Sequence, residues 1–183
     1  EDAYRAWVKR KAPDQLDAIS VGLPPATEVW QETMGIEDGI RHPEQRFPVT
    51  FDNWYTQPGF CKFSDETLQL AYVGTLAPSD QVMLKTGAET LQDFAARLKQ
   101  EHLVNLQAER PPVFKAIRIP YKGRRERYYS YCATHRVHNF GKHRVVINHR
   151  HADLSDKPVI LMSNRLHSQA PGITRIRPHL WPI

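Results

Sequence analysis

With 183 residues, 40% hydrophobic and 25% charged, and a formal net charge of +5, the sequence is that of one globular domain, or of one domain with an insertion. The longest purely apolar run, Val159–Met162, is far shorter than the ~18 residues needed to span a bilayer, and the start of the chain lacks the apolar segment of a signal peptide. Membrane, collagen-like, disulfide-rich and fully disordered classes are therefore excluded, and the cysteines, Cys61 and Cys132, are interpreted as reduced thiols of a cytoplasmic protein.

The first half of the chain predicts helices and short strands. Thr27 is a candidate cap for a helix that we expect over residues 28–34. Residues 47–52 are a short run rich in β-forming residues, which predicts a buried strand that ends at Asp52. A short helix is expected from Pro58 to Leu68, and a second strand over residues 69–76.

The second half begins with the clearest helix, over residues 88–107. Its apolar residues recur at helical spacing: Leu91, Phe94, Ala95, Leu98, His102 and Leu106. After two prolines the period changes to two, which predicts strands at 113–121, 127–138, 143–149 and 158–163, with turns at 122–125 and 139–142. This is an antiparallel meander, and a helix is expected to begin at Ala170.

The net charge conceals a strong asymmetry along the chain. Residues 1–109 carry a net charge of −7, whereas residues 115–150 carry ten Lys and Arg and a single acid, Glu126. Such a field attracts polyanions, and the aromatic residues among the arginines offer rings on which bases can stack: Tyr121, Tyr128, Tyr129, Tyr131 and Phe140. The alternative is a solvated basic face without a partner.

Two places in the sequence are candidates for metal chemistry. Asp52, at the end of a predicted strand, is suited to hold a divalent cation, although a strand-terminal Asp more often caps the next turn. Cys132, His135 and His138 are residue types that bind zinc, but residues three apart on a strand point to opposite faces, which disfavours a shared ion. No hydrolase nucleophile elbow or phosphate-binding glycine loop is present.

Five segments carry a family resemblance: VTFDNWY (49–55), YYSYC (128–132), NFGK (139–142), LMSNRLH (161–167) and GITRIRPHLWP (172–182). In these segments the chain resembles the bacterial insertion-sequence transposases of the DDE type, which are RNase H-like enzymes that cut and rejoin DNA. The resemblance covers most of residues 47–183. It implies an α/β (α+β) fold: a partial RNase H-like core over residues 1–109, a basic β-rich insertion over 110–163, and the start of a core helix over 164–183.

In that family three carboxylates hold two Mg²⁺ or Mn²⁺ ions for attack on a phosphodiester, and Asp52 resembles the second of the three. None of Asp2, Asp14, Asp17 and Asp38 ends an apolar strand, as the first carboxylate would, and the chain ends at Ile183 before the helix that carries the final glutamate. The chain also starts with Glu1 rather than Met. The expectation is a central fragment of a transposase that is catalytically incomplete and, with one acid of three, binds no such metal pair by itself.

The resemblance and the charge together predict DNA, at the transposon ends, as the partner. Phosphate contacts are expected from Lys122, Arg124, Arg125, Arg127, Lys142 and Arg144. A sheet that lacks its first strands exposes an edge, so association with a second copy or with full-length transposase is also expected. The alternatives are a non-catalytic nucleic-acid-binding protein derived from a transposase and a module that docks on the full-length enzyme. The expected location is the bacterial cytoplasm, at the nucleoid.

Overall fold

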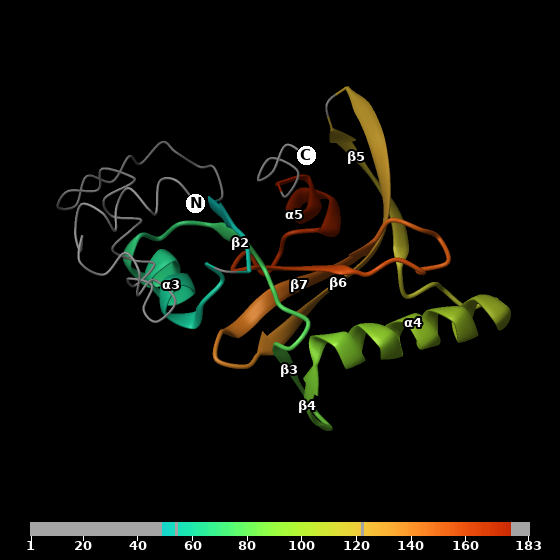
Figure 1. Ribbon diagram of the computed structural model, residues 1–183, viewed down its shortest axis with the longest axis horizontal. Coiled ribbons are helices and arrows are strands. Elements are labelled where there is room, and N and C mark those ends of the chain that lie inside the picture. Colours follow the sequence, from blue (N-terminus) through green and yellow to red (C-terminus); the bar gives the residue numbers. More distant parts are fainter. Residues whose placement is uncertain (1–48, 54, 122, 177–183) are drawn as a thin grey trace, which may run out of the picture. The chain divides into compact units, whose positions relative to one another are not determined.

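The computed structural model describes residues 49–53, 55–121 and 123–176, all of which belong to one compact unit, residues 46–183. The described residues form a mixed sheet of eight strands with three α-helices (Figure 1). The α/β class predicted from the sequence is therefore confirmed. The helix predicted over residues 28–34 lies outside the described residues.

The strand before Asp52 is followed by a helix and a parallel strand. β1 (Val49–Phe51) pairs in parallel with β2 (Tyr72–Thr75), so that Phe51 lies beside Gly74. Between them, α3 (Pro58–Lys62) starts at a proline, as helices often do, and continues as a π-helical segment over Phe63–Thr67. All three elements occur where the sequence predicts them.

The long helix α4 (Leu91–Gln107) starts three residues later than predicted. Residues 87–90 instead form β4 (Gly87–Thr90), which makes a hairpin with β3 (Gln81–Leu84) that the sequence did not indicate. Thr90 ends the strand and caps the helix: its hydroxyl accepts the Asp93 N–H at 3.1 Å and donates to the Asp93 carboxylate at 2.7 Å. Five of the six predicted apolar-stripe residues are buried; Leu106 is 52% exposed.

The predicted antiparallel meander is present. It consists of β5 (Lys115–Tyr121), β6 (Arg124–Val137), β7 (Gly141–His149) and β8 (Val159–Ser163). The strand order is β1-β2-β8-β7-β6-β3-β4, and β5 pairs with the part of β6 that precedes its contact with β3. Because β8 pairs with β2, the meander and the strand before Asp52 share one sheet. The predicted boundary between residues 109 and 110 falls between α4 and β5. Strands from both sides of this boundary belong to the same sheet.

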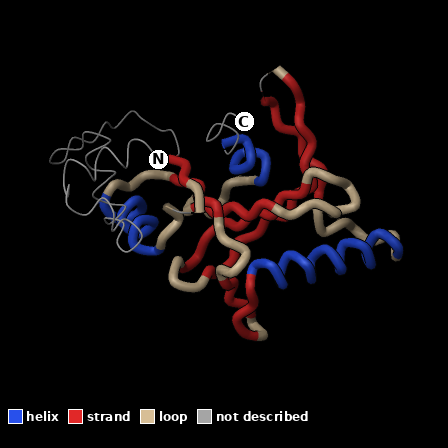
Figure 2. The backbone as a smooth tube through the Cα atoms, viewed as in Figure 1, coloured by secondary structure: helices blue, strands red, loops and turns tan. Residues whose placement is uncertain are grey.

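Helices cover the sheet on both faces (Figure 2). On one face, α5 (Ala170–Ile176) places Ala170 and Ile173 against Val73, Val146 and Leu161. On the other face, the core is aromatic: Phe94 of α4 packs edge-on against the rings of Tyr131 and His135. Among the described helices, none combines the length and the apolar character needed to cross a membrane.

Candidate nucleic-acid interface

The hairpin of β5 and β6 gathers three arginines on one face. Its register places Arg118 directly opposite Arg127, and Pro120 opposite Arg125. Residues two apart on a strand, and residues paired across an antiparallel ladder, share a face, so Arg118, Arg125 and Arg127 lie together. All three are exposed. We call them the arginine face; in Figure 1 this end of the hairpin extends past the rest of the sheet.

The single acid of the hairpin does not neutralise this face. Glu126 is on the opposite side of the ladder, where it accepts a hydrogen bond of 2.6 Å from the Tyr128 hydroxyl. The ion pairs formed between described residues lie elsewhere, at Lys62–Glu66, Arg97–Glu89 and His149–Asp156. Like charges directly opposite in a ladder are destabilising. An anion bound at the arginine face would therefore relieve the repulsion between Arg118 and Arg127.

The other predicted phosphate contacts are not part of this group. Arg124 is exposed but falls on the Glu126 side of the hairpin. Lys142 is paired opposite Arg136, nine residues along β6 from Arg127, which is about 30 Å at the rise of a strand. The structure therefore separates this exposed Lys142–Arg136 pair from the arginine face. Lys122 lies outside the described residues.

Arg144 makes structural contacts. Its Nε donates to the Ser168 carbonyl at 3.0 Å, and its Nη1 donates to the Thr134 hydroxyl at 3.3 Å. The side chain is half-buried and ties β7 to the segment before α5. Its role as a phosphate contact is the weakest of those predicted, because a guanidinium held by two acceptors has fewer donors left for a ligand.

Two of the aromatic residues among the arginines, Tyr128 and Tyr131, belong to the core. Tyr128 is 5% exposed. The Tyr131 ring packs against Phe94 and Phe114, and its hydroxyl is 2.8 Å from Nε2 of His135. Tyr129, half-buried and paired opposite Ala116, shares the face of Arg127. It is the one of these rings that the register places beside the arginine face.

Asp52 caps a turn. Its Oδ1 accepts the Tyr55 N–H at 3.3 Å, and its carbonyl accepts both the Thr56 N–H at 3.0 Å and the Thr56 hydroxyl at 2.6 Å. Within residues 49–53, 55–121 and 123–176, no three His, Cys, Asp or Glu side chains form a metal-binding group. The described residues thus do not fit a two-metal site, which needs further carboxylates beside Asp52.

Cys132 and His135 point to opposite sides of β6, as the strand period predicts. The Cys132 thiol lies 3.9 Å from the Ser168 carbonyl on the α5 side, whereas the His135 ring packs on Phe94 of α4. Cys61 and Cys132 are free thiols. Burial raises the pKa of Cys61 to about 12 and also raises the pKa of Cys132, so both thiols are protonated and poorly reactive at neutral pH.

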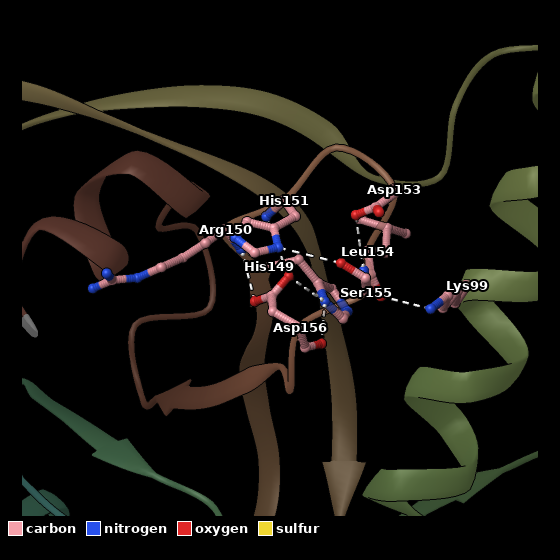
Figure 3. A network of polar contacts seen from close by, with 8 residues as sticks. All are labelled: Lys99, His149, Arg150, His151, Asp153, Leu154, Ser155 and Asp156. Atoms are coloured by element: carbon pink, nitrogen blue, oxygen red, sulfur yellow. Dashed lines mark hydrogen bonds and ion pairs between the residues drawn. The ribbon is translucent and has the colours of Figure 1, made fainter.

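Sequence reasoning missed two groups of residues. Arg118 was not singled out, although period-two alternation and the position of the turn were sufficient signals to pair it with Arg127. The second group, around His149 and Asp156, is assembled by a loop and by α4 (Figure 3), and no short motif marks it. No protein-family model matches the chain, and a comparison with curated proteins finds no significant match.

Proposed function

We propose that this chain is a DNA-binding segment of a DDE-type insertion-sequence transposase. The observation that carries the proposal is the arginine face, where Arg118 and Arg127 oppose each other and Arg125 lies beside them, all exposed. Three guanidinium groups at this spacing suit the phosphates of a nucleic-acid backbone. Binding through phosphates is independent of sequence, so recognition of a transposon end requires further contacts.

The fold supports the same proposal at a coarser level. β1, α3 and the parallel strand β2 form a β-α-β unit with Asp52 at the end of its first strand, and the basic meander follows in the chain. This order is compatible with an RNase H-like core that carries an inserted meander. Among the described strands, β1 lies at one end of the sheet, opposite the end that β4 forms. Its free edge is where a second copy or a full-length transposase would add a strand.

The chemistry of the parent family is Mg²⁺- or Mn²⁺-dependent cleavage and strand transfer. Because the described residues offer Asp52 without the further ligands, we assign to this part of the chain the binding of DNA and no step of the reaction. The second candidate is a non-catalytic nucleic-acid-binding protein derived from a transposase, and it is favoured by the turn-capping contacts of Asp52. Either reading places the chain with the DNA of a bacterial nucleoid.

The test is DNA affinity as a function of salt. Fluorescence anisotropy with a labelled duplex is measured between about 50 and 200 mM salt, for the wild type and for Arg118→Gln/Arg125→Gln/Arg127→Gln. The salt slope of the wild type is expected to be steep, and the triple variant is expected to reduce it by about 2 to 3, since each phosphate contact contributes about 0.9. With Mg²⁺ present, gel analysis of the same samples should show uncut DNA.

The matched control removes the same charge elsewhere. Lys85→Gln/Arg110→Gln/Arg165→Gln changes three exposed cations outside the hairpin and should leave the slope within about one unit of the wild type. Equal losses in both triple variants would mean that net charge, and not the arginine face, binds DNA. Mg²⁺-dependent cleavage that disappears in Asp52→Ala would overturn the assignment of binding without chemistry.

A further inference from the structure

The outer part of the β5–β6 hairpin is a ribbon of two strands. β6 pairs with β7 from Tyr129 onward, whereas its residues 124–128 pair with β5 alone among the described strands. β5 itself pairs with β6 and with no other described strand. Residues 117–121 and 124–128 therefore form a ribbon that is two strands wide. We call it the hairpin ribbon, and its end extends past the rest of the sheet in Figure 1.

The turn keeps the ribbon narrow to its end. Tyr121 is paired opposite Arg124, so two residues connect the strands. Gly123, the second of them, has a φ of 75°, which a glycine adopts without strain and which tight two-residue hairpin loops need. Neighbouring strands lie about 4.8 Å apart. The major groove of B-form DNA, about 12 Å wide, admits such a two-stranded ribbon, whereas the minor groove is about 6 Å wide.

The back of the hairpin ribbon is packed against the body of the protein. Ile117 contacts the core cluster to which α5 contributes Ala170 and Ile173. On the same face, Ile119 is 1% exposed and Tyr128 is buried as well. The ribbon is thus supported from behind, and the arginine face is the side that a ligand can reach. A flat, supported face suits docking onto a groove better than a hairpin without packing, which is marginally stable in water.

The opposed arginines suit the two walls of a groove. Arg118 and Arg127 are on different strands and directly opposite each other, with Cα atoms about 4.5–5.5 Å apart. Their like charges repel, which favours side-chain conformations that diverge toward the two edges of the ribbon. In a groove these edges face the two phosphate backbones, so each guanidinium has a phosphate of its own. A single strand has one row of phosphates and would leave one arginine of the pair without a partner phosphate.

Other macromolecules fit this ribbon less well. Pro120 is in β5, and a proline in an edge strand disfavours the addition of a further strand from another protein. Single-stranded nucleic acids bind on several exposed aromatic rings. Beside the arginine face the register places Tyr129, which is half-buried. Duplex DNA is therefore the partner that the ribbon favours.

We propose that the hairpin ribbon lies in the major groove of duplex DNA, with Arg118 at one phosphate backbone and Arg127 at the other. Arg125 is two residues nearer the turn, about 6.8 Å along β6. This distance equals two steps of about 3.4 Å along the DNA axis, so Arg125 follows Arg127 along the same backbone. The inference rests on the proposed function, because it specifies how the arginine face meets DNA.

A duplex with a filled major groove tests this placement. Two short duplexes of the same mixed sequence are titrated with the full chain by fluorescence anisotropy. One is unmodified, and in the other every cytosine is replaced by glucosylated 5-hydroxymethylcytosine. The sugar occupies the major groove and leaves the phosphate charge and the minor groove unchanged. We expect the modified duplex to bind at least about 10-fold more weakly than the unmodified one. The unpaired strand of the same sequence should also bind more weakly than the unmodified duplex.

Two variants assign the preference to the ribbon. The triple glutamine variant of the arginine face should bind both duplexes weakly and with nearly equal affinity. The charge-matched control, Lys85→Gln/Arg110→Gln/Arg165→Gln, should keep the wild-type preference for the unmodified duplex. Equal affinity of the wild type for the two duplexes, or tighter binding to the single strand, would overturn the major-groove placement and leave DNA binding itself in place. Absence of binding to either duplex would overturn the proposed function as well.

Discussion

Gly74 sets how closely β2 approaches the turn after Asp52. A Cβ atom on this residue would lie 2.8 Å from Oγ1 of Thr56 and 3.0 Å from Cε2 of Phe51, and both neighbours are buried. Oγ1 of Thr56 is also bonded to the Asp52 carbonyl, so it cannot move without loss of that contact. We expect Gly74→Ala to lower the free energy of unfolding by about 1–3 kcal/mol, measured by urea denaturation.

Gly59 is the matched control for this substitution. It lies in α3, and a Cβ atom there would meet nothing within 4 Å. Gly59→Ala should therefore leave stability unchanged or raise it by up to about 1 kcal/mol, through the better helix propensity of alanine. Equal stability of the two variants would contradict the close packing of β2 against the turn after Asp52.

In the β5–β6 hairpin, the same arginines that we propose to bind DNA lower the stability of the fold. The arginines at 118 and 127 face each other without an acid between them. Arg118→Thr removes this repulsion and adds a β-forming residue, so the free energy of unfolding should rise by about 0.2–1 kcal/mol at low salt. The gain should shrink at high salt, where exposed charges are screened. Under the proposed function, the same variant binds DNA more weakly.

Lys115→Thr is the control for the hairpin. Lys115 is an exposed cation of the same strand, but it is paired opposite Ser130 and not opposite another cation. Its substitution should leave the salt dependence of stability nearly unchanged. A destabilised Arg118→Thr variant in denaturant titrations at low salt would show that the arginine pair is not repulsive, so that an anion would have no repulsion to relieve at this face.

The strands and helices that the sequence predicts correctly have strong local signals. The meander follows from period-two alternation between turns whose residues adopt positive φ, at Gly123, Asn139 and Gly141. The β3–β4 hairpin was missed because its strands have four residues each and β4 buries none of its side chains. Because residues 87–90 have no alternating apolar pattern, the helix-forming residues Ala88 and Glu89 led to a predicted helix that begins too early.

The positive charge of the candidate interface could be predicted from the sequence, but the residues that form it could not. The net positive charge of the meander is evident from the residues alone. Which of its side chains lie together depends on the strand register and on contacts between residues distant in sequence. Arg144 is engaged by Ser168, 24 residues away. Tyr131 enters the core because α4 covers that face of β6. The group around His149 and Asp156 requires α4 and the loop between β7 and β8 together, and no local sequence signal indicates that they meet.

The folded unit contains four histidines, three buried and one half-buried, whose charged forms it disfavours. Burial is the main cause that lowers the pKa in each case: His102, His135, His143 and His149. Below pH ~6.5 the unfolded chain binds protons at these side chains, while the folded protein does not until a lower pH. The unfolded state then holds more protons, so stability falls as the pH falls. Each histidine contributes up to about 1.4 kcal/mol per pH unit in this window.

Urea denaturation at pH 7.5 and at pH 5.5 measures this loss, which we expect because the four contributions have the same sign. His135→Gln keeps a polar partner for the Tyr131 hydroxyl but cannot be protonated, so it should reduce the pH dependence of the free energy of unfolding. Stability that stays constant between the two pH values would mean that water reaches these imidazoles in the folded state. The aromatic layer between α4 and the sheet would then be looser than its ring contacts require.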